Sequence, residues 1–228
     1  MIKFENVSKQ FPFGNKALDG ITFNIEKGEF LYLVGPSGAG KTTILKLILK
    51  QTNPTNGNIT INEIPLNFDD NKQTEILRRN IGVVFQDFKI LNDKNIFENA
   101  ALGLKILGIS HKKIIKEVNE ALKLVGILDK KYMFPAQLSA GELQRTAIAR
   151  AIVGDRDIIL ADEPTGNLDP TTSWEIMKIF KKLERDKTII FATHNTDIVN
   201  SYRKRVVTVK GGKMIKDEKK GGYDLWPI

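Results

Sequence analysis

The sequence predicts a single α/β domain built on a mostly parallel sheet. Its 228 residues are enough for one domain with a full core, and 41% hydrophobic and 27% charged residues are ordinary for a globular protein. Short apolar runs, which predict strands, alternate with segments whose apolar residues recur every three or four positions, which predict helices. Such alternation is typical of a parallel sheet covered by helices. A helical block at residues 95–128 interrupts this alternation and is expected to form a separate lobe.

The first part of the chain is predicted to be rich in strands. Apolar and polar residues alternate over 2–7 and 21–26, with a glycine-containing loop between them. An apolar run at 30–34 ends at a glycine, as a buried strand would, and 41–50 is predicted to be a helix. After a turn marked by proline, asparagine and glycine, further strands are expected around Ile59 to Ile61 and over 81–85.

The second part continues with helices and strands. In the helical block an apolar face is predicted from the 3–4 spacing of Ile114, Ile115, Val118, Leu122 and Val125. The remaining elements expected are strands at 158–161 and 188–193, a helix at 171–185, and two short strands near 205–210 and 213–216.

Composition excludes several classes of site. The chain has no cysteine, which rules out disulfides and thiolate metal sites, and His111 and His194 are too few for a histidine-rich metal centre. No apolar stretch approaches the roughly 20 residues of a membrane span, and no secretory signal is visible at the N-terminus. The net charge of +8 comes from scattered lysines, which favours a solvated surface, then proximity to a membrane, over binding to nucleic acid.

The segment GPSGAGKT, which begins at Gly35, matches the pattern G-x-x-x-x-G-K-[ST] between a predicted strand and a predicted helix. Gly35, Gly38 and Gly40 let the backbone wrap closely around phosphate, and the N-terminus of the following helix supplies positive potential. Lys41 is expected to reach the β- and γ-phosphates, and Thr42 to offer its hydroxyl to Mg²⁺. A glycine-rich turn without a ligand is the alternative, but the lysine and threonine stand at the required positions. The segment therefore predicts a nucleoside triphosphate site.

A second candidate site segment is the apolar run that begins at Ile158 and is followed by Asp162 and Glu163. Ligands bind at the carboxyl ends of parallel strands, so both acids are expected at the binding edge of the sheet. Asp162 would hold Mg²⁺, directly or through water, and Glu163 would accept a hydrogen bond from the attacking water. Two solvated acids at a strand end are the alternative, which the nearby phosphate loop disfavours.

The segment Ser139 to Glu142 reads as a capping box, S-x-x-E, that opens a helix through residue 151. This structural role does not exclude binding, because a capped helix N-terminus attracts anions. Ser139 Oγ and the Gly141 N–H are therefore expected to reach a γ-phosphate. Since the phosphate loop already surrounds the chain's own ATP, we expect this second anion site to meet ATP held by another copy.

Two single residues follow predicted strands at the same edge of the sheet. Gln86 is expected either to touch Mg²⁺ or the attacking water, or to lie in an exposed loop. His194 is placed to contact a γ-phosphate, although a lone histidine after a strand is usually structural.

In this order the motifs resemble those of the ATP-binding cassette (ABC) ATPases over nearly the whole chain. GPSGAGKT is similar to their Walker A motif, Gln86 to the Q-loop, LSAGE to the signature, DIILADE to Walker B, Asn167 to Asp169 to the D-loop, and His194 to the switch histidine. The resemblance implies a P-loop NTPase fold with a RecA-like parallel-sheet core, an antiparallel β subdomain and an inserted α-helical subdomain. The implied division is 1–87 and 150–217 for the core with the β subdomain, 88–149 for the helical subdomain, and 218–228 for a C-terminal tail.

The same resemblance implies ATP and Mg²⁺ as ligands, and it assigns residues to each. Catalytic roles fall to Lys41, Gln86, Glu163 and His194, and the Mg²⁺ ligands would be Thr42, Gln86 and Asp162. Nucleotide binding falls to Phe11, Gly35, Pro36, Ser37, Gly38, Ala39, Gly40, Lys41, Thr42 and Thr43, and to Ser139, Gly141 and Glu142. Phe11 would stack on adenine, with a core strand position as the alternative.

A narrower resemblance is to the FtsE ATPases of FtsEX cell-division complexes. It rests on MIKFENVSKQF, ALDGITF and LRRNIGVVFQDFKIL, on ADEPTGNLD followed by FATHN, and on the tail KDEKKGGYDLWPI. It implies a head-to-tail homodimer around ATP, an integral FtsX-like membrane subunit, a peripheral position on the cytoplasmic face of the membrane, and control of peptidoglycan hydrolysis.

Other functional classes stay open or are disfavoured. ADEPTGNLD is shared with LolD-like lipoprotein-release and MacB-like efflux ATPases, which leaves that class as the alternative. Soluble DNA-repair ATPases split the same head with long coiled coils, and no heptad stretch occurs here. Two departures from the family pattern are Ala140, where glycine is usual, and Asn195, where aspartate often follows the histidine; both are expected to be tolerated.

Overall fold

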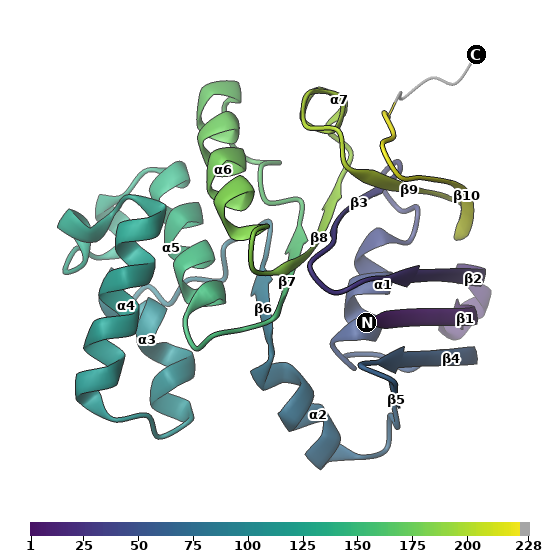
Figure 1. Cartoon of the computed structure of the whole chain (residues 1–228), viewed down its shortest axis with the longest axis horizontal. Coiled ribbons are helices and arrows are strands. Elements are labelled where there is room, and N and C mark those ends of the chain that lie inside the picture. The colour runs from purple at the N-terminus through teal and green to yellow at the C-terminus, as the bar shows by residue number, and fades with distance from the viewer. Residues whose placement is uncertain (224–228) are drawn as a thin grey trace.

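The computed structural model describes residues 1–223, which form two sheets with helices packed around them (Figure 1). Of the predicted C-terminal tail at 218–228, residues 224–228 lie outside the described part of the chain. The strands are β1 Ile2–Gln10, β2 Lys16–Ile25, β3 Phe30–Val34, β4 Asn56–Ile61, β5 Ile64–Pro65, β6 Ile81–Val84, β7 Ile158–Asp162, β8 Thr188–Thr193, β9 Arg205–Lys210 and β10 Lys213–Glu218. The helices are α1 Lys41–Ile48, α2 Asn71–Arg79, α3 Ile96–Ile106, α4 His111–Val125, α5 Ala140–Ile152, α6 Pro170–Leu183 and α7 Thr196–Ser201.

The larger sheet has the strand order β10-β9-β3-β8-β7-β6. Its strands β9, β3, β8, β7 and β6 pair in parallel, and β10 adds an antiparallel edge to β9. The smaller sheet, in the order β2-β1-β4-β5, is antiparallel. A parallel core with a separate antiparallel sheet and a helical insertion confirms the predicted fold class.

The parallel strands are buried on both faces, which explains why they read as continuous apolar runs. In β3, Leu31 and Leu33 pack into a cluster with α1 and the small sheet, whereas Phe30, Tyr32 and Val34 pack into a second cluster under α3, α4, α5 and α6. Figure 1 shows α1 between the two sheets and the lobe of α3 and α4 on the far side of β6 and β7. The sheet therefore separates two cores, and its carboxyl edge remains available for a site.

The predicted apolar face of α4 is present, with one exception. Ile114, Val118, Leu122 and Val125 are buried against the lobe, but Ile115 is 40% exposed. Neighbouring helical residues are rotated by about 100°, so a residue directly after a core position points away from it. The prediction was wrong for Ile115 and correct for the other four positions.

Three elements have no counterpart in the sequence prediction: β5, α2 and α7. Helix α2 buries none of its residues, so it carries no apolar stripe for the pattern to reveal. It is held instead by the Asp70 side chain, which accepts from Gln73 N, and by Arg78, which donates to the Leu49 carbonyl. Helix α5 continues to Ile152 and so crosses the predicted subdomain boundary between 149 and 150. Within residues 1–223, no helix combines the length and apolar character that crossing a membrane requires.

Candidate functional site

The phosphate loop joins β3 to α1 at the carboxyl edge of the large sheet. Its last glycine, Gly40, has a φ of 113°, and a Cβ there would lie 2.7 Å from Leu18 Cδ2 and 2.8 Å from the Ala17 carbonyl oxygen. Only glycine fits such a close approach with this backbone conformation. The loop therefore packs directly against β2 and leads into the N-terminus of α1, whose backbone N–H groups attract anions.

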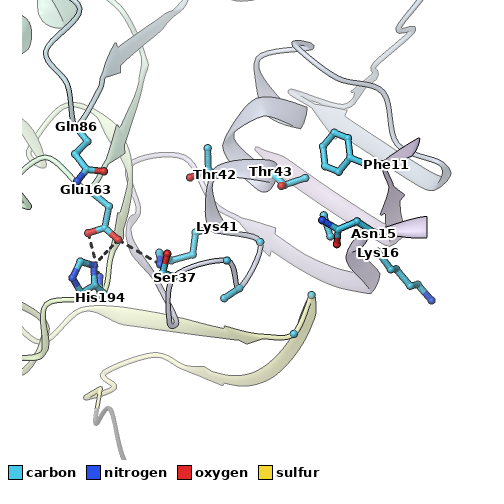
Figure 2. A pocket seen from close by; sticks show the side chains of 16 residues that line it. Phe11, Asn15, Lys16, Ser37, Lys41, Thr42, Thr43, Gln86, Glu163 and His194 are labelled. Atoms are coloured by element: carbon cyan, nitrogen blue, oxygen red, sulfur yellow. Dashed lines mark hydrogen bonds and ion pairs between the residues drawn. The ribbon is translucent and has the colours of Figure 1, made fainter. Parts of the chain in front are cut away.

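A cavity of about 650 Å³ opens beside this loop (Figure 2). Its lining contains these predicted site residues: Phe11, Ser37, Gly38, Ala39, Gly40, Lys41, Thr42, Thr43, Gln86, Glu163 and His194. In Figure 2, Phe11 lies at one end near Asn15 and Lys16, and Glu163 and His194 lie at the other. The cavity thus has an aromatic end suited to a base and a charged end suited to phosphates.

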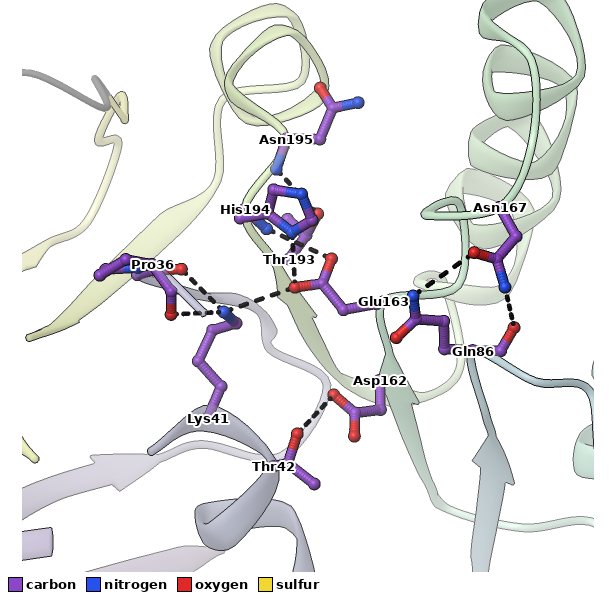
Figure 3. Close-up of polar contacts among 11 residues, drawn as sticks. Pro36, Lys41, Thr42, Gln86, Asp162, Glu163, Asn167, Thr193, His194 and Asn195 are labelled. Carbon is purple, nitrogen blue, oxygen red and sulfur yellow. Dashed lines mark hydrogen bonds and ion pairs between the residues drawn. The ribbon is translucent and has the colours of Figure 1, made fainter. Parts of the chain in front are cut away.

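Three charged or ionisable side chains meet at the phosphate end of the cavity (Figure 3). Lys41 is 6% exposed, and its Nζ donates to the carbonyls of Gly35, at 2.7 Å, and Pro36, at 3.2 Å. The same Nζ lies 3.4 Å from Glu163 Oε1, which is 2.9 Å from His194 Nδ1. Glu163 therefore connects the lysine of the phosphate loop to the histidine that follows β8.

Glu163 has an uncommon backbone conformation, with φ of 47°. Its N–H donates to the Ala192 carbonyl at 2.9 Å, which ties the end of β7 to β8. Left-handed conformations of non-glycine residues cost free energy and are found at functional sites when the surrounding structure enforces them. Here the strained backbone directs the carboxylate along the cavity toward Lys41 and His194.

The predicted Mg²⁺ ligands also lie together. Thr42 Oγ1 donates to Asp162 Oδ1 at 3.2 Å. Thr42 and Gln86 line the cavity, and Asp162 lies behind Thr42, outside the lining. Burial raises the pKa of Asp162, an effect that the hydrogen bond from Thr42 opposes and the charge of Glu163 reinforces. Hydroxyl, carboxylate and amide oxygens are the ligands that Mg²⁺ prefers, so this donor set fits the ion.

Gln86 makes a contact that the motifs did not predict. Its Nε2 lies 3.5 Å from Asn167 Oδ1, and Asn167 Nδ2 donates to the Gln86 carbonyl at 3.1 Å. This pair links the loop after β6 to the loop after β7. Other cavity residues that the sequence did not single out are Asn15, Lys16, Ala17, Gly211 and Gly212, which belong to no local pattern and reach the site only through the packing of β2 and the β9–β10 turn.

Ser139, Gly141 and Glu142 do not line this cavity. They line a separate one of about 320 Å³ at the N-terminus of α5. The predicted capping box is present, because Ser139 Oγ accepts from Glu142 N at 3.4 Å and Glu142 Oε2 accepts from Ser139 N at 2.9 Å. Lys130 forms an ion pair with Glu142, and that pair is the main reason that the pKa of Glu142 is lowered. The residues predicted to contact phosphate therefore line two separate cavities of one chain.

Both departures from the family pattern have a structural explanation. Ala140 is exposed at the first turn of α5, and it is absent from the residues with positive φ within the described chain. The methyl group therefore lies at an exposed position that needs no positive φ. Asn195 caps α7 by accepting from Ile198 N at 3.1 Å, a role that asparagine and aspartate perform equally well.

Comparison with known proteins identifies the family of this chain. The family model described as ABC transporter matches residues 18–166. The FtsE cell division ATP-binding protein of Bacillus subtilis is 49% identical over 98% of this chain and 98% of its own length. FtsE of Escherichia coli strain K12 is 42% identical over 94% of this chain and 97% of its own length.

Solved structures share the whole architecture. The dimeric structure of MJ0796, a bacterial ABC transporter cassette, superposes with a TM-score of 0.88 at 36% identity and covers 98% of this chain and 100% of its own. The same cassette is known in a post-hydrolysis state bound to ADP and phosphate. CbiO1 of Clostridium perfringens, part of the cbiONQ transporter complex, gives a TM-score of 0.89 at 32% identity over 96% of this chain and 88% of its own. The chain thus belongs to the ABC transporter family, as one of its ATP-binding, ATP-hydrolysing cassettes.

Proposed function

We propose that the chain is the ATPase subunit of an FtsE-type complex, in which ATP-driven association of two copies moves an integral, FtsX-like membrane subunit. It would act peripherally at the cytoplasmic face of the cell membrane and regulate cell division through peptidoglycan hydrolysis. The names of the curated relatives, at 42–49% identity, support the cell-division role. The subdomain division at residues 87/88 and 149/150 is part of this proposal.

Binding of ATP begins with a rearrangement at the phosphate loop. Phe11 stacks on the base, and the loop N–H groups with the start of α1 hold the phosphates. Lys41 now donates to carbonyls of its own loop and faces Glu163, so it must turn toward the β- and γ-phosphates when they enter. Departure of Lys41 leaves the Glu163 carboxylate free to accept a hydrogen bond from water.

Hydrolysis then depends on how the chain orients water and stabilises charge. Glu163 holds the attacking water, while Lys41 and His194 donate to the oxygens of the transferring phosphoryl group. Thr42, Asp162 and Gln86 would hold Mg²⁺, which when bound neutralises charge on the β- and γ-phosphates. The Gln86–Asn167 pair would hold the Q-loop against the D-loop during this step.

The observation that carries the dimeric mechanism is the separation of the two anion-attracting sites. The phosphate loop lines one cavity, and the capped N-terminus of α5 lines another. Ser139 and Gly141 therefore do not complete the ATP site of their own chain. In a head-to-tail pair, each chain would offer this helix N-terminus to the γ-phosphate bound by its partner, which makes ATP the contact between copies.

The Glu163→Gln variant tests this mechanism. It keeps the shape of the side chain but removes its charge, so ATP should bind, remain intact and hold two chains together. Light scattering should report twice the monomer mass with ATP and the monomer mass with ADP. The Lys41→Ala/Glu163→Gln variant is the matched control and should stay monomeric with either nucleotide. A Glu163→Gln chain that remains monomeric at high concentration with saturating ATP would contradict the proposal.

The alternative is an ATPase subunit of a LolD-like or MacB-like lipoprotein-release or efflux transporter. Both classes share the ATP site, so the membrane partner is what separates them. Purification of the tagged chain from its native membranes should recover an FtsX-like subunit. Recovery of a transporter subunit in its place would favour the alternative.

A further inference from the structure

The segment Gly221–Tyr223 follows β10 and returns to α7, the helix that begins just after His194. Asn200, on α7, binds Tyr223 of this segment through both the oxygen and the nitrogen of its side-chain amide. Its Oδ1 accepts from Tyr223 N at 2.8 Å, and its Nδ2 donates to the Tyr223 carbonyl at 3.0 Å. The pair imitates the reciprocal bonding of two neighbouring strands.

The fit around this pair is close. Gly221 N donates to the Lys204 carbonyl at 3.1 Å, and a Cβ on Gly222 would lie 2.7 Å from Asn200 Oδ1. Tyr223 is 6% exposed and belongs to the same buried cluster as Ile198 and Val199 of α7. Hydrogen bonds and close packing therefore hold the segment against Asn200 on α7 and against the loop that follows this helix.

More than half of the His194 side chain is exposed, so the position of the helix that follows it helps to set where the ring lies. Its side chain is 56% exposed, and its contacts run to Glu163, from Nδ1 at 2.9 Å and from its N–H at 3.3 Å. Figure 3 shows it on the segment between β8 and α7, beside Asn195, which caps that helix. A helix of six residues has little stability of its own, so α7 depends on what packs against it.

Tyr223 is also electrostatically close to the site. Burial raises the pKa of its hydroxyl, and the negative charge of Glu163 adds to that rise.

We propose that Gly221–Tyr223 is a latch that holds α7 through Asn200 and thereby positions His194 for ATP hydrolysis. Asn200 and Tyr223 are positioning residues, since they act on the phosphate through His194. This role deepens the proposed function and rests on the part that His194 plays there. It also connects the segment Gly221–Tyr223 to the ATP site.

Steady-state hydrolysis and nucleotide affinity of the full chain test the latch. Asn200→Ala removes both bonds to Tyr223, and Tyr223→Ala removes the buried ring. Each should lower kcat about tenfold, within the roughly 100-fold that a 1 Å misplacement of a catalytic group can cost, and leave the Kd for ATP within twofold. Tyr223→Phe keeps the ring and both backbone bonds and is the matched control, with kcat expected within twofold of the unaltered chain. Asn200→Asp keeps the acceptor for Tyr223 N but sets a carboxylate oxygen against the Tyr223 carbonyl, so it should lower kcat at least as much as Asn200→Ala.

A double-mutant cycle separates a latch from a merely structural contact. In a His194→Gln background, Asn200→Ala should cause no further loss of kcat, because the group that it positions is already gone. The same tenfold loss in both backgrounds would overturn the proposal.

The two histidines of the chain provide a readout without catalysis. In NMR spectra, Asn200→Ala should shift and broaden the ring signals of His194 and leave those of His111 unchanged. Unchanged His194 signals would also overturn the latch. A normal kcat for His194→Gln alone would instead overturn the role of His194 in the proposed function, and the ring signals would then decide whether the segment holds that side chain.

Discussion

At the residue scale, adjacent positions of the signature differ in what they tolerate. Ala140 is exposed, whereas Gly141 is buried, and a Cβ on Gly141 would lie 2.5 Å from Thr172 Cγ2 on α6. The family pattern has glycine at both positions, yet only the second glycine is required by contact. This difference explains why alanine is accommodated at 140.

Substitution at Gly141 should therefore lower stability and ATP-dependent association more than substitution at Ala140. Gly141→Ala should destabilise the fold by about 1–3 kcal/mol through overpacking and reduce ATP-dependent association. Ala140→Gly should change ATP hydrolysis by less than about twofold, at a helix-propensity cost of at most about 1 kcal/mol. Denaturant unfolding and light scattering measure both effects.

Thr172→Ser supplies the control, because it removes the methyl group that a residue larger than glycine would meet. Combined with Gly141→Ala, it should restore most of the lost stability. If the double variant is no more stable than Gly141→Ala alone, the contact with Thr172 is not the cause.

Much of the site could be predicted at this scale because its motifs are local. Gly35 to Thr42, Asp162 with Glu163, and Ser139 to Glu142 each lie within one turn or strand end, so spacing reveals them. The contact of Glu163 with both Lys41 and His194 joins segments more than 30 residues apart, and no local pattern encodes it. The same holds for Asn167 beside Gln86.

At the element scale, α5 connects the two functional regions. Its N-terminus carries the signature, and near its other end Arg150 donates to the carbonyls of Phe88 and Lys89 in the loop after Gln86. Both loop residues have left-handed backbones, with φ of 57° and 51°. A guanidinium that satisfies two carbonyls of a strained loop holds that loop in place, so movement of α5 should be transmitted to Gln86.

Arg150→Ala should reduce both stability and activity. Loss of two charge-assisted hydrogen bonds to carbonyls should cost about 2–4 kcal/mol, and a displaced Gln86 should lower kcat. Arg156→Ala is a matched control, because Arg156 also donates to carbonyls, those of Val153 and Ile81, away from the cavity. It should lose stability but keep the kcat of the folded fraction. Equal kcat in both variants would show that Arg150 is purely structural.

Strands and helices could be predicted where their burial produces a regular pattern of apolar residues in the sequence. Strands β3 and β8 match the predicted ranges, since their apolar runs are bounded by polar residues and glycine. Helix α2 has no buried residue, and α7 is only six residues long, too short for a helical period to repeat twice. Their existence depends on capping and on contacts with distant segments, which spacing does not encode.

At the scale of the whole molecule, tertiary structure places three regions around one cavity. The order β10-β9-β3-β8-β7-β6 brings the phosphate loop, Glu163 and His194 to neighbouring strand ends. The same topology leaves the signature helix to line a different cavity. Alternation of strands and helices predicts a parallel sheet but not its strand order, so the sequence predicted a separate second site, whereas its place in a different cavity is given only by the structure.

We infer that ATP joins the phosphate loop of one copy to the signature of another. Cross-linking between residues of these two regions tests that contact. The chain contains no cysteine, so single thiols can be introduced without removing others. Ser37→Cys and Ala140→Cys, both at exposed positions, are made separately on the Glu163→Gln background and mixed with a short thiol cross-linker. We expect a covalent dimer in the mixture, with ATP and not with ADP, and little product when either variant is alone. Cross-linking of each variant to itself, with none between the two, would contradict the head-to-tail arrangement.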